Sequence, residues 1–313
     1  MKKLAFVSLL VVAAISPFLS FGAECVYLKP LGASEERTTQ DGESWATAYA
    51  DPATAIAAAA SAGKPVYAAQ GVYNVPATIS IGGALDIYGG FAGVSMEETV
   101  DSRNPAVCQT IFTGDTGLDD VWMHYEPNTS FGFDKTDLEE PVIKNGKINE
   151  PPDFTADYDG YGQSVKGTNG QRCLEISNGE GVIDGIVFSG FYFSKGDGSV
   201  VSVTVASGKT LVFSNCRFVA NGSRTGNIEG SSEGISVKCC RFEYCFGDYR
   251  SSAITEHGGK TIAVSDCLFR CISRPSANGG NVLIKATEGT ALELLKKIKK
   301  DISSKFIYKI GYR

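Results

Sequence analysis

Short apolar runs separated by glycine-, serine- or asparagine-rich turns recur through the second half of the chain. Four of them share one pattern, in which a turn residue leads into a short strand that ends in phenylalanine; they span 185–188, 215–218, 239–242 and 266–269. The four phenylalanines are 30, 24 and 27 residues apart. Short strands that repeat at such a variable period are typical of a β-solenoid, whose stacked coils pair their backbones about 4.8 Å apart. The pattern therefore predicts an all-β fold built as a parallel β-helix.

Stacking of these copies predicts two columns of side chains inside the coils. One column is made of cysteines (Cys216, Cys240 and Cys267) and the other of phenylalanines (Phe188, Phe218, Phe242 and Phe269). Buried cysteines commonly serve as small apolar filler. The alternatives are a disulfide among Cys239, Cys245 and Cys271, or a metal site. Residues 239 and 240 are neighbours in a strand and face opposite ways, which counts against a shared tetrahedral metal.

The N-terminal third predicts one helix and several strands. Asp51 and Pro52 suit the N-cap and the first helical position of an alanine-rich helix that Gly63 ends. Apolar runs at 66–69, 78–81 and 85–88 then predict strands separated by glycine or proline. A β-helix needs a cover over its first coil, and we expect this helix, together with Trp45, to supply it.

The N-terminal end of the chain differs from the rest. Lys2 and Lys3 precede an apolar run that ends at Leu19, and small residues follow at 20 and 22, as in a secretory signal peptide. The run is shorter than the roughly 20 apolar residues of a membrane-spanning helix, and no later segment is long and apolar enough. We therefore expect no transmembrane segment after removal of the signal, and a protein that is exported to the extracellular space, the outer membrane or the cell surface.

The C-terminal end is basic and poor in glycine. Its apolar residues fall at helical spacing among lysines: Ala291, Leu294, Leu295, Ile298 and Ile302. This spacing predicts a helix that caps the last coil, and a non-native tail and a membrane-surface helix are the alternatives. The predicted organisation is a signal peptide at 1–22, an N-terminal cap at 23–64, a β-helix at 65–285 with an acidic excursion at about 115–160, and a basic helical tail at 286–313.

Charge and composition narrow the classes of partner. Lys and Arg number 29 against 35 Asp and Glu, and the net charge of −6 disfavours nucleic-acid binding because it repels phosphate. Two histidines leave little room for a histidine-built zinc site. Nothing in the pattern sets the oligomeric state.

Several N-terminal motifs carry a resemblance to a known superfamily. Gly-Glu-Ser-Trp at 42–45, Tyr-Gly-Gly-Phe-Ala-Gly at 88–93 and Thr-Ile-Phe-Thr-Gly-Asp at 110–115 resemble right-handed parallel β-helix proteins of the pectin-lyase-like superfamily. Phe-Val-Ala-Asn at 218–221 is similar to one element of the repeats of polymorphic outer membrane proteins, although Cys245 replaces the asparagine in the next copy. The resemblance implies a right-handed β-helix and leaves the activity open, because lyases, hydrolases and adhesins share this fold.

The acidic excursion departs from the strand rhythm. It contains twelve Asp and Glu and several prolines, with a small hairpin expected around 142–148. It is interpreted either as a solvated acidic loop or as a face that binds a cation or a basic partner. Asp157 and Asp159 are weak calcium candidates, because both ends of an EF-hand loop placed on them fail. No other cofactor is expected.

No complete catalytic motif is present, so no catalytic residue is assigned. Asp119 and Asp120 are paired carboxylates inside the excursion, and Arg217 and Arg241 occupy equivalent positions on successive coils. Stacked arginines either solubilise the outer face or bind a uronate or sulfated sugar through bidentate contacts. The ligand-binding candidates are Asp119, Asp120, Asp157, Asp159, Arg217 and Arg241.

The expected function is non-catalytic and adhesin-like, with a carbohydrate or a host or cell surface as the ligand. One alternative is a lyase or glycoside hydrolase acting on an acidic polysaccharide. It requires at least three residues of the set formed by Asp115 and these six candidates to converge in one groove. The other alternative is a truncated fragment of a larger surface protein.

Overall fold

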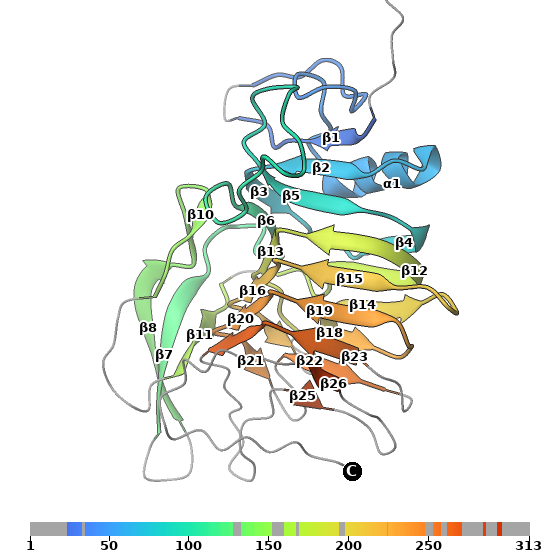
Figure 1. Ribbon diagram of the computed structural model, residues 1–313. Helices are drawn as coiled ribbons and strands as arrows, with labels where there is room; N and C mark the ends of the chain where they lie inside the picture. Colours follow the sequence, from blue (N-terminus) through green and yellow to red (C-terminus); the bar gives the residue numbers. More distant parts are fainter. Residues whose placement is uncertain are drawn as a thin grey trace, which may run out of the picture.

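The computed structural model describes residues 24–32, 35–127, 133–151, 160–166, 169–193, 198–223, 225–247, 253–257, 262–270, 284–285 and 293–295. They form an all-β fold of mostly parallel sheets with one short helix (Figure 1). The expected signal peptide at 1–22 lies outside the described residues. No helix among the described residues is long and apolar enough to cross a membrane.

The parallel strands lie on three faces. Face A contains β1 (Val26–Leu28), β2 (Val66–Ala69), β5 (Ile87–Phe91), the end of β12 (Leu174–Asp184), β15 (Leu211–Ser214), β19 (Ile235–Lys238), β23 (Ile262–Ser265) and β26 (Glu293–Leu295). Face B contains β3 (Gly71–Asn74), β6 (Thr110–Thr113), β13 (Ile186–Ser189), β16 (Arg217–Val219), β20 (Arg241–Glu243) and β24 (Leu268–Arg270). Face C contains β4 (Ile79–Ala84), the start of β12, β14 (Ser199–Val205), β18 (Gly226–Gly230), β22 (Ile254–Glu256) and β25 (Ile284–Lys285).

From β4 onward the chain visits these faces in the repeated order C, A, B. Each strand pairs in parallel with the strand that follows it on the same face, as β16 does with β13 and β20. One further parallel pair joins β17 (Gly222–Ser223) to β21 (Phe246–Gly247). Stacked parallel strands visited in this order are compatible with a β-helix.

The predicted phenylalanine column is confirmed. Phe188, Phe218, Phe242 and Phe269 occupy matching register positions on face B. Their rings stack nearly parallel, with centroids 4.8, 4.9 and 5.2 Å apart along the column. All four are buried, so the column forms the centre of the core.

The cysteine column is also buried, and its members are free thiols. Cys216, Cys240 and Cys267 are each at most 1% exposed and precede the matched strands β16, β20 and β24. Burial raises the pKa of the Cys240 thiol, which stays protonated and donates to the carbonyl of Lys238. Cys239 and Cys245 are free thiols as well, whereas Cys271 lies outside the described residues. In the described part of the chain, these cysteines therefore act as filler and not as disulfides.

A sharp corner joins face A to face B in four successive turns, from β12 to β24. The residue just before each cysteine of the column has left-handed backbone: Asn215 at φ 51°, Cys239 at φ 53° and Asp266 at φ 51°. Gly185 takes the corresponding place one turn earlier, at φ 72°. Asparagine, aspartate and glycine tolerate this conformation, whereas cysteine is strained there. The corner therefore sets the position at which each following strand of face B begins.

The N-terminal end contains the predicted helix, α1 (Pro52–Ala62). Asp51 accepts a hydrogen bond from the Thr54 backbone N–H at 2.8 Å, and Gly63 ends the helix with φ 64°. The inner side of α1 packs into the main core through Ile56 and two alanines. The N-cap residue Asp51 and the C-cap residue Gly63 were therefore predicted correctly from the sequence.

The first strand of the stack is not covered by α1 and Trp45 together, contrary to the prediction from the sequence. Strand β1 lies inside the segment expected to be the cap, and it is the first parallel strand of face A. Its outer edge is paired by the loop that follows, because the Tyr27 backbone N–H donates to the Gly42 carbonyl at 2.9 Å and the Tyr27 carbonyl accepts from the Tyr49 backbone N–H at 2.9 Å. Trp45 packs against Tyr27 on the opposite side of this strand from α1. Loop and helix thus cover different parts of the end of the stack.

The helix predicted at the C-terminal end is wrong where the structure describes it. Residues 293–295 form strand β26, which pairs in parallel with β23 and places Leu294 opposite Val264. The edge of β23 offers unpaired backbone groups, and this pairing overrides a weak helical spacing. Ala291, Ile298 and Ile302 lie outside the described residues.

Candidate functional site

The chain leaves the parallel stack after β6 and forms a lateral excursion before β12. The excursion contains an antiparallel sheet of β7 (Val121–Pro127), β8 (Phe133–Pro141) and β11 (Gly160–Ser164). It also contains an antiparallel hairpin of β9 (Ile143–Lys144) and β10 (Lys147–Ile148), where the sequence predicted one. Figure 1 shows these strands beside the main stack.

The base of the excursion packs onto the outer side of face B. Trp122 is fully buried, its ring lies 5.3 Å from that of Tyr244, and its Nε1–H donates to the Asn149 carbonyl at 2.7 Å. An apolar cluster continues from the excursion to the outward residues of β6, β13 and β16: Ile111, Trp122, Val142, Ile143, Ile148, Val187, Val219, Ala220 and Tyr244. The interpretation as a solvated loop is therefore wrong for this base, because buried apolar contacts anchor it.

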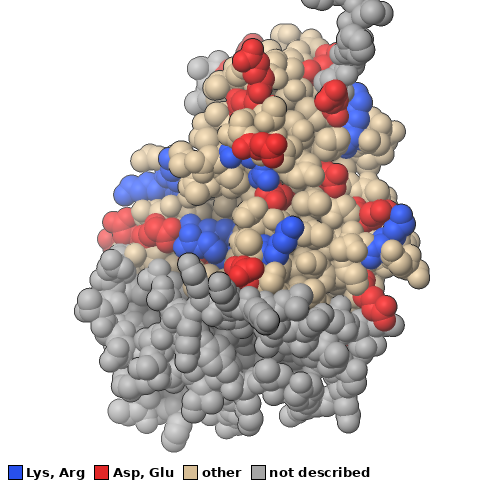
Figure 2. All heavy atoms as spheres, in the orientation of Figure 1, with Lys and Arg blue, Asp and Glu red and all other residues tan. Residues whose placement is uncertain are grey.

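A groove of about 550 Å³ lies where the hairpin meets the corner between faces A and B. Its lining comes from the segment after β5, from the end of the hairpin and from three successive corners: Val100, Arg103, Asn104, Pro105, Ala106, Gln109, Glu150, Gly185, Val187, Asn215, Cys216, Arg217, Cys239 and Arg241. Basic and acidic side chains alternate on the side of the molecule seen in Figure 2. The groove lining contains three arginines and one carboxylate.

The two arginines predicted from the repeat lie side by side in this groove. Arg217 and Arg241 are paired in register on β16 and β20. Arg217 is 8% exposed, and its Nε–H donates to the fully buried Glu243 at 2.6 Å. Arg241 donates through Nη2 to the same carboxylate at 2.7 Å, but its side chain is 49% exposed. Arg217 therefore links strand β16 to strand β20 through Glu243, whereas the guanidinium of Arg241 is accessible to solvent.

Arg103 and Glu150 complete the charged lining, and the sequence did not reveal them. Glu150 binds Nη2 of Arg217 with both carboxylate oxygens, at 2.8 and 2.9 Å. Arg103 pairs with Asp184 at 2.6 Å and donates to the Gly89 carbonyl at 2.9 Å. Its buried Nε–H has no hydrogen-bond partner among the described residues. Arg103 and Asp184 are 81 residues apart in the chain, so no local motif signals their contact.

No other described residue takes up the remaining donors of the exposed Arg241 guanidinium. Each terminal nitrogen of a guanidinium carries two N–H groups, and Glu243 takes one of them at Nη2. Whichever N–H Glu243 takes, the second N–H of Nη2 remains beside an N–H of either Nε or Nη1, and the two together form a pair of parallel donors. Such an edge matches the two oxygens of a carboxylate or sulfate. The groove can therefore bind an anionic group at Arg241.

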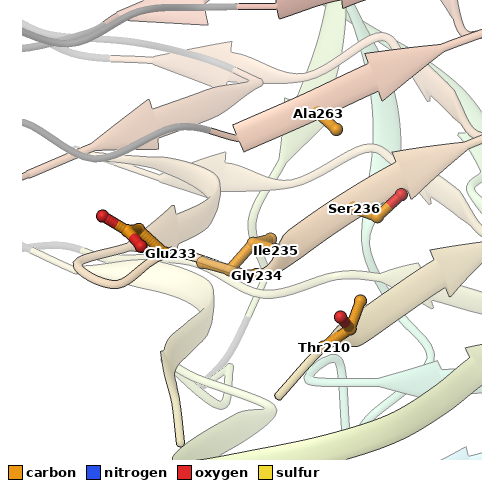
Figure 3. A pocket seen from close by; sticks show the side chains of 6 residues that line it. All are labelled: Thr210, Glu233, Gly234, Ile235, Ser236 and Ala263. Atoms are coloured by element: carbon orange, nitrogen blue, oxygen red, sulfur yellow. The ribbon is translucent and has the colours of Figure 1, made fainter. Parts of the chain in front are cut away.

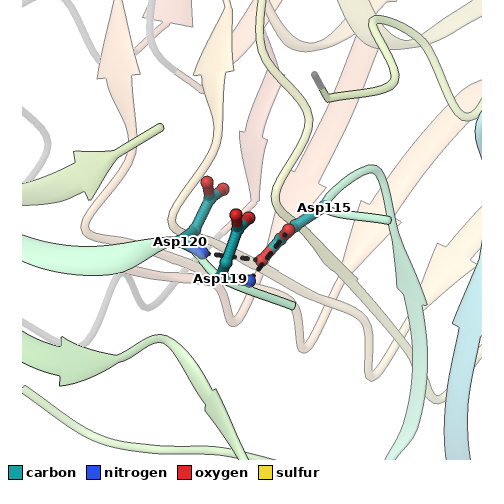
Figure 4. A group of neighbouring side chains, drawn as sticks. All are labelled: Asp115, Asp119 and Asp120. Atoms are coloured by element: carbon teal, nitrogen blue, oxygen red, sulfur yellow. Dashed lines mark hydrogen bonds between the residues drawn. The ribbon is translucent and has the colours of Figure 1, made fainter. Parts of the chain in front are cut away.

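The predicted acidic candidates form a separate group. Side-chain oxygens of Asp115, Asp119 and Asp120 lie within 4.8 Å of one another (Figure 4). Asp115 accepts from the backbone N–H groups of Asp119 and Asp120, at 3.3 and 3.1 Å. Asp120 accepts from the side-chain amide of Asn169 at 2.6 Å and from the Lys166 backbone N–H at 2.8 Å. These bonds close the turn where the excursion leaves and rejoins the stack.

The acidic group and the arginines lie at opposite ends of the face-B strands. The aspartates follow the last residue of β6, whereas Arg217 and Arg241 are the first residues of β16 and β20. Burial raises the pKa of the Asp115 carboxyl, as expected for a group enclosed in a turn. Asp157 and Asp159 lie outside the described residues. Asp115, Asp119 and Asp120 thus lie together, as the enzyme hypothesis asks of three candidates, but they do not line the groove that contains Arg217 and Arg241.

A second hollow of about 320 Å³ lies between faces C and A. Thr210, Glu233, Gly234, Ile235, Ser236 and Ala263 line it, as Figure 3 shows. Its lining contains one carboxylate and no basic side chain. It therefore offers less for recognition of a charged ligand than the arginine groove.

Comparisons with protein-family models, curated proteins and solved structures found no match. The resemblance to β-helix superfamilies thus rests on the sequence motifs and on the parallel stack.

Proposed function

We propose that this chain is an exported, right-handed parallel β-helix protein that binds acidic glycans through the arginine groove. In this role it acts as an adhesin-like protein at a cell surface and carries out no catalysis. The repeated C, A, B order of the strands and the N-terminal motifs support the β-helix. The apolar run after Lys2 and Lys3 supports export.

The half-exposed Arg241 guanidinium carries the proposal for binding. It lies in a groove with Arg103 and Arg217, in a chain whose net charge is −6. Glu243 holds its Nη2 in place, so the free donor edge is oriented before a ligand arrives. A preoriented guanidinium loses less conformational entropy when it binds a carboxylate or sulfate.

A glycan array that contains polyuronates, sulfated glycans and neutral polysaccharides tests this proposal. We expect the wild-type protein to bind the acidic glycans selectively and to lose affinity as salt increases. Arg241→Gln should weaken binding at least about tenfold, because charge-assisted hydrogen bonds contribute about 1.5–3 kcal/mol each. Arg172→Gln is the matched control, since Arg172 pairs with Glu175 outside the groove. Equal binding to neutral and acidic glycans, or equal loss in the two variants, would refute the proposal.

Catalysis is not proposed, because the neighbouring carboxylates Asp115, Asp119 and Asp120 do not line the groove that contains the arginines. A lyase or hydrolase acting on acidic polysaccharide would need acid and base groups at the bound sugar. The lining of the arginine groove supplies only Glu150 as a carboxylate, and that group is bound to Arg217.

A further inference from the structure

We propose that Glu150 occupies a second anion subsite, at Arg217, and that an acid group of a multiply charged glycan displaces it. This inference rests on the proposed function and specifies its ligand. A glycan with one acid group would use Arg241 alone, whereas a glycan with several would also take the place of Glu150. The preferred ligand is therefore a polyanionic oligosaccharide.

The contacts of Arg217 distinguish two kinds of carboxylate. Glu243 is fully buried and lies on the same face as Arg217, so it is a fixed part of the sheet. Glu150 belongs to the excursion, 67 residues away in sequence, and its side chain is 57% exposed. Both of its oxygens lie within 2.9 Å of a single guanidinium nitrogen, Nη2 of Arg217, so Glu150 occupies a position where a ligand carboxylate could bind the same nitrogen. Glu150 is thus the carboxylate that can leave without exposing the core.

The charges in the groove support exchange of Glu150 for a ligand. Arg103 is neutralised by Asp184, and Arg217 and Arg241 share the single charge of Glu243. One positive charge then remains, and Glu150 balances it. A ligand with one acid group at Arg241 brings this groove to one net negative charge, and a ligand whose second acid group replaces Glu150 leaves the groove at that same charge, so the second acid group adds no further repulsion. Arg217 and Arg241 lie on adjacent parallel strands, about 4.8 Å apart at the backbone, so one oligosaccharide can reach both.

The docking of the hairpin does not depend on Glu150. Val142, Ile143 and Ile148 are buried in the apolar cluster, and Trp122 donates to the carbonyl of Asn149, the residue before Glu150. Removal of the Glu150 charge should therefore leave the hairpin in place. Because Trp122 touches this segment directly, its fluorescence reports whether the hairpin remains docked.

Glu150→Gln tests the inference, with affinities measured by calorimetry for a heparin tetrasaccharide and for methyl glucuronide, which has one carboxylate. We expect the variant to bind the tetrasaccharide about fivefold more tightly, the effect of removing a like charge about 4 Å away in a wet groove. The gain for methyl glucuronide should be smaller, because its single acid group binds at Arg241 and does not compete with Glu150 for Arg217. Glu140→Gln is the matched control, because Glu140 is a half-exposed acid of the same excursion that pairs with Lys144 outside the groove.

Each outcome separates this inference from the proposed function. If the wild-type protein binds neither probe, the proposed function itself fails. If it binds both, and Glu150→Gln leaves the tetrasaccharide affinity unchanged or lowers it while Trp122 emission is unaltered, the subsite is refuted. Should Trp122 emission change, Glu150→Met, which fills the same space without a charge, replaces the glutamine variant and is judged by the same affinities.

Discussion

The stacked phenylalanine column can be tested by replacing its middle ring. Phe218 is fully buried, and its ring lies between those of Phe188 and Phe242, 4.8 and 4.9 Å away. Phe218→Leu removes both ring contacts while it keeps an apolar side chain of similar bulk. Phe213 is the matched control: it is equally buried, on face A, and has no aromatic ring contact among the described residues.

The expected loss follows from these contacts. Replacing either phenylalanine by leucine leaves a small cavity, which costs about 1–2 kcal/mol. A stacked aromatic pair contributes about 0.5–1.5 kcal/mol beyond the area it buries. Phe218 makes two such pairs, so Phe218→Leu should be less stable than Phe213→Leu by about 1–3 kcal/mol.

Urea unfolding of the wild-type protein and the two variants, followed by circular dichroism, measures this difference. If the rings stack turn over turn, Phe218→Leu should have the lower midpoint, with an unchanged dependence of stability on urea. Equal midpoints for the two variants, with a difference below about 0.5 kcal/mol, would contradict the stacked arrangement, since both substitutions remove the same atoms.

Three further predictions concern other parts of the structure. Burial tends to raise the pKa of Glu98, but four backbone N–H donors at 92–95 outweigh it and lower the pKa below its ordinary 4.5. The stabilisation by the Glu98 carboxylate is fully present above pH 4.5 and is lost as the pH falls through the lowered pKa. Glu98→Gln should therefore be about 1 kcal/mol less stable than the wild-type protein at pH 7, measured by urea unfolding. Its stability should also depend less on pH below about 4.5, measured by acid titration. Cys239→Asn should raise the free energy of unfolding by about 0.5–1 kcal/mol, because asparagine tolerates left-handed backbone, as Asn215 does at the equivalent corner one turn earlier. A lower urea midpoint would contradict the strain at this corner. Trp122→Phe leaves the Asn149 carbonyl without its donor and should cost about 1–3 kcal/mol, with faster proteolysis of the excursion than in Trp45→Phe.

The sequence predicted the parallel stack because its cause is local and repeated. A corner residue, a cysteine and a phenylalanine recur at similar positions, and each copy pairs its strand with the copies directly before and after it. Spacing alone is therefore sufficient to give the register of face B. The same reasoning failed for β26, where the helical spacing of a few leucines indicated the wrong element. Its backbone groups are paired by the edge of β23, an effect of tertiary context that no local pattern contains.

The groove was predicted only in part, for a related physical reason. Arg217 and Arg241 recur in the repeat, so their adjacency could be read from the sequence. Glu150 and Arg103 come from segments inserted between repeats, and their partners lie 67 and 81 residues away. An insertion has no periodic relation to the strands on which it packs, so its contacts depend on how its apolar base docks. Here Trp122 and the hairpin fix that docking, and they thereby place Glu150 on Arg217. The acidic composition of the excursion suggested a solvated loop. In the structure, one of its acidic residues, Glu150, instead binds Arg217, whose position is set by the repeat.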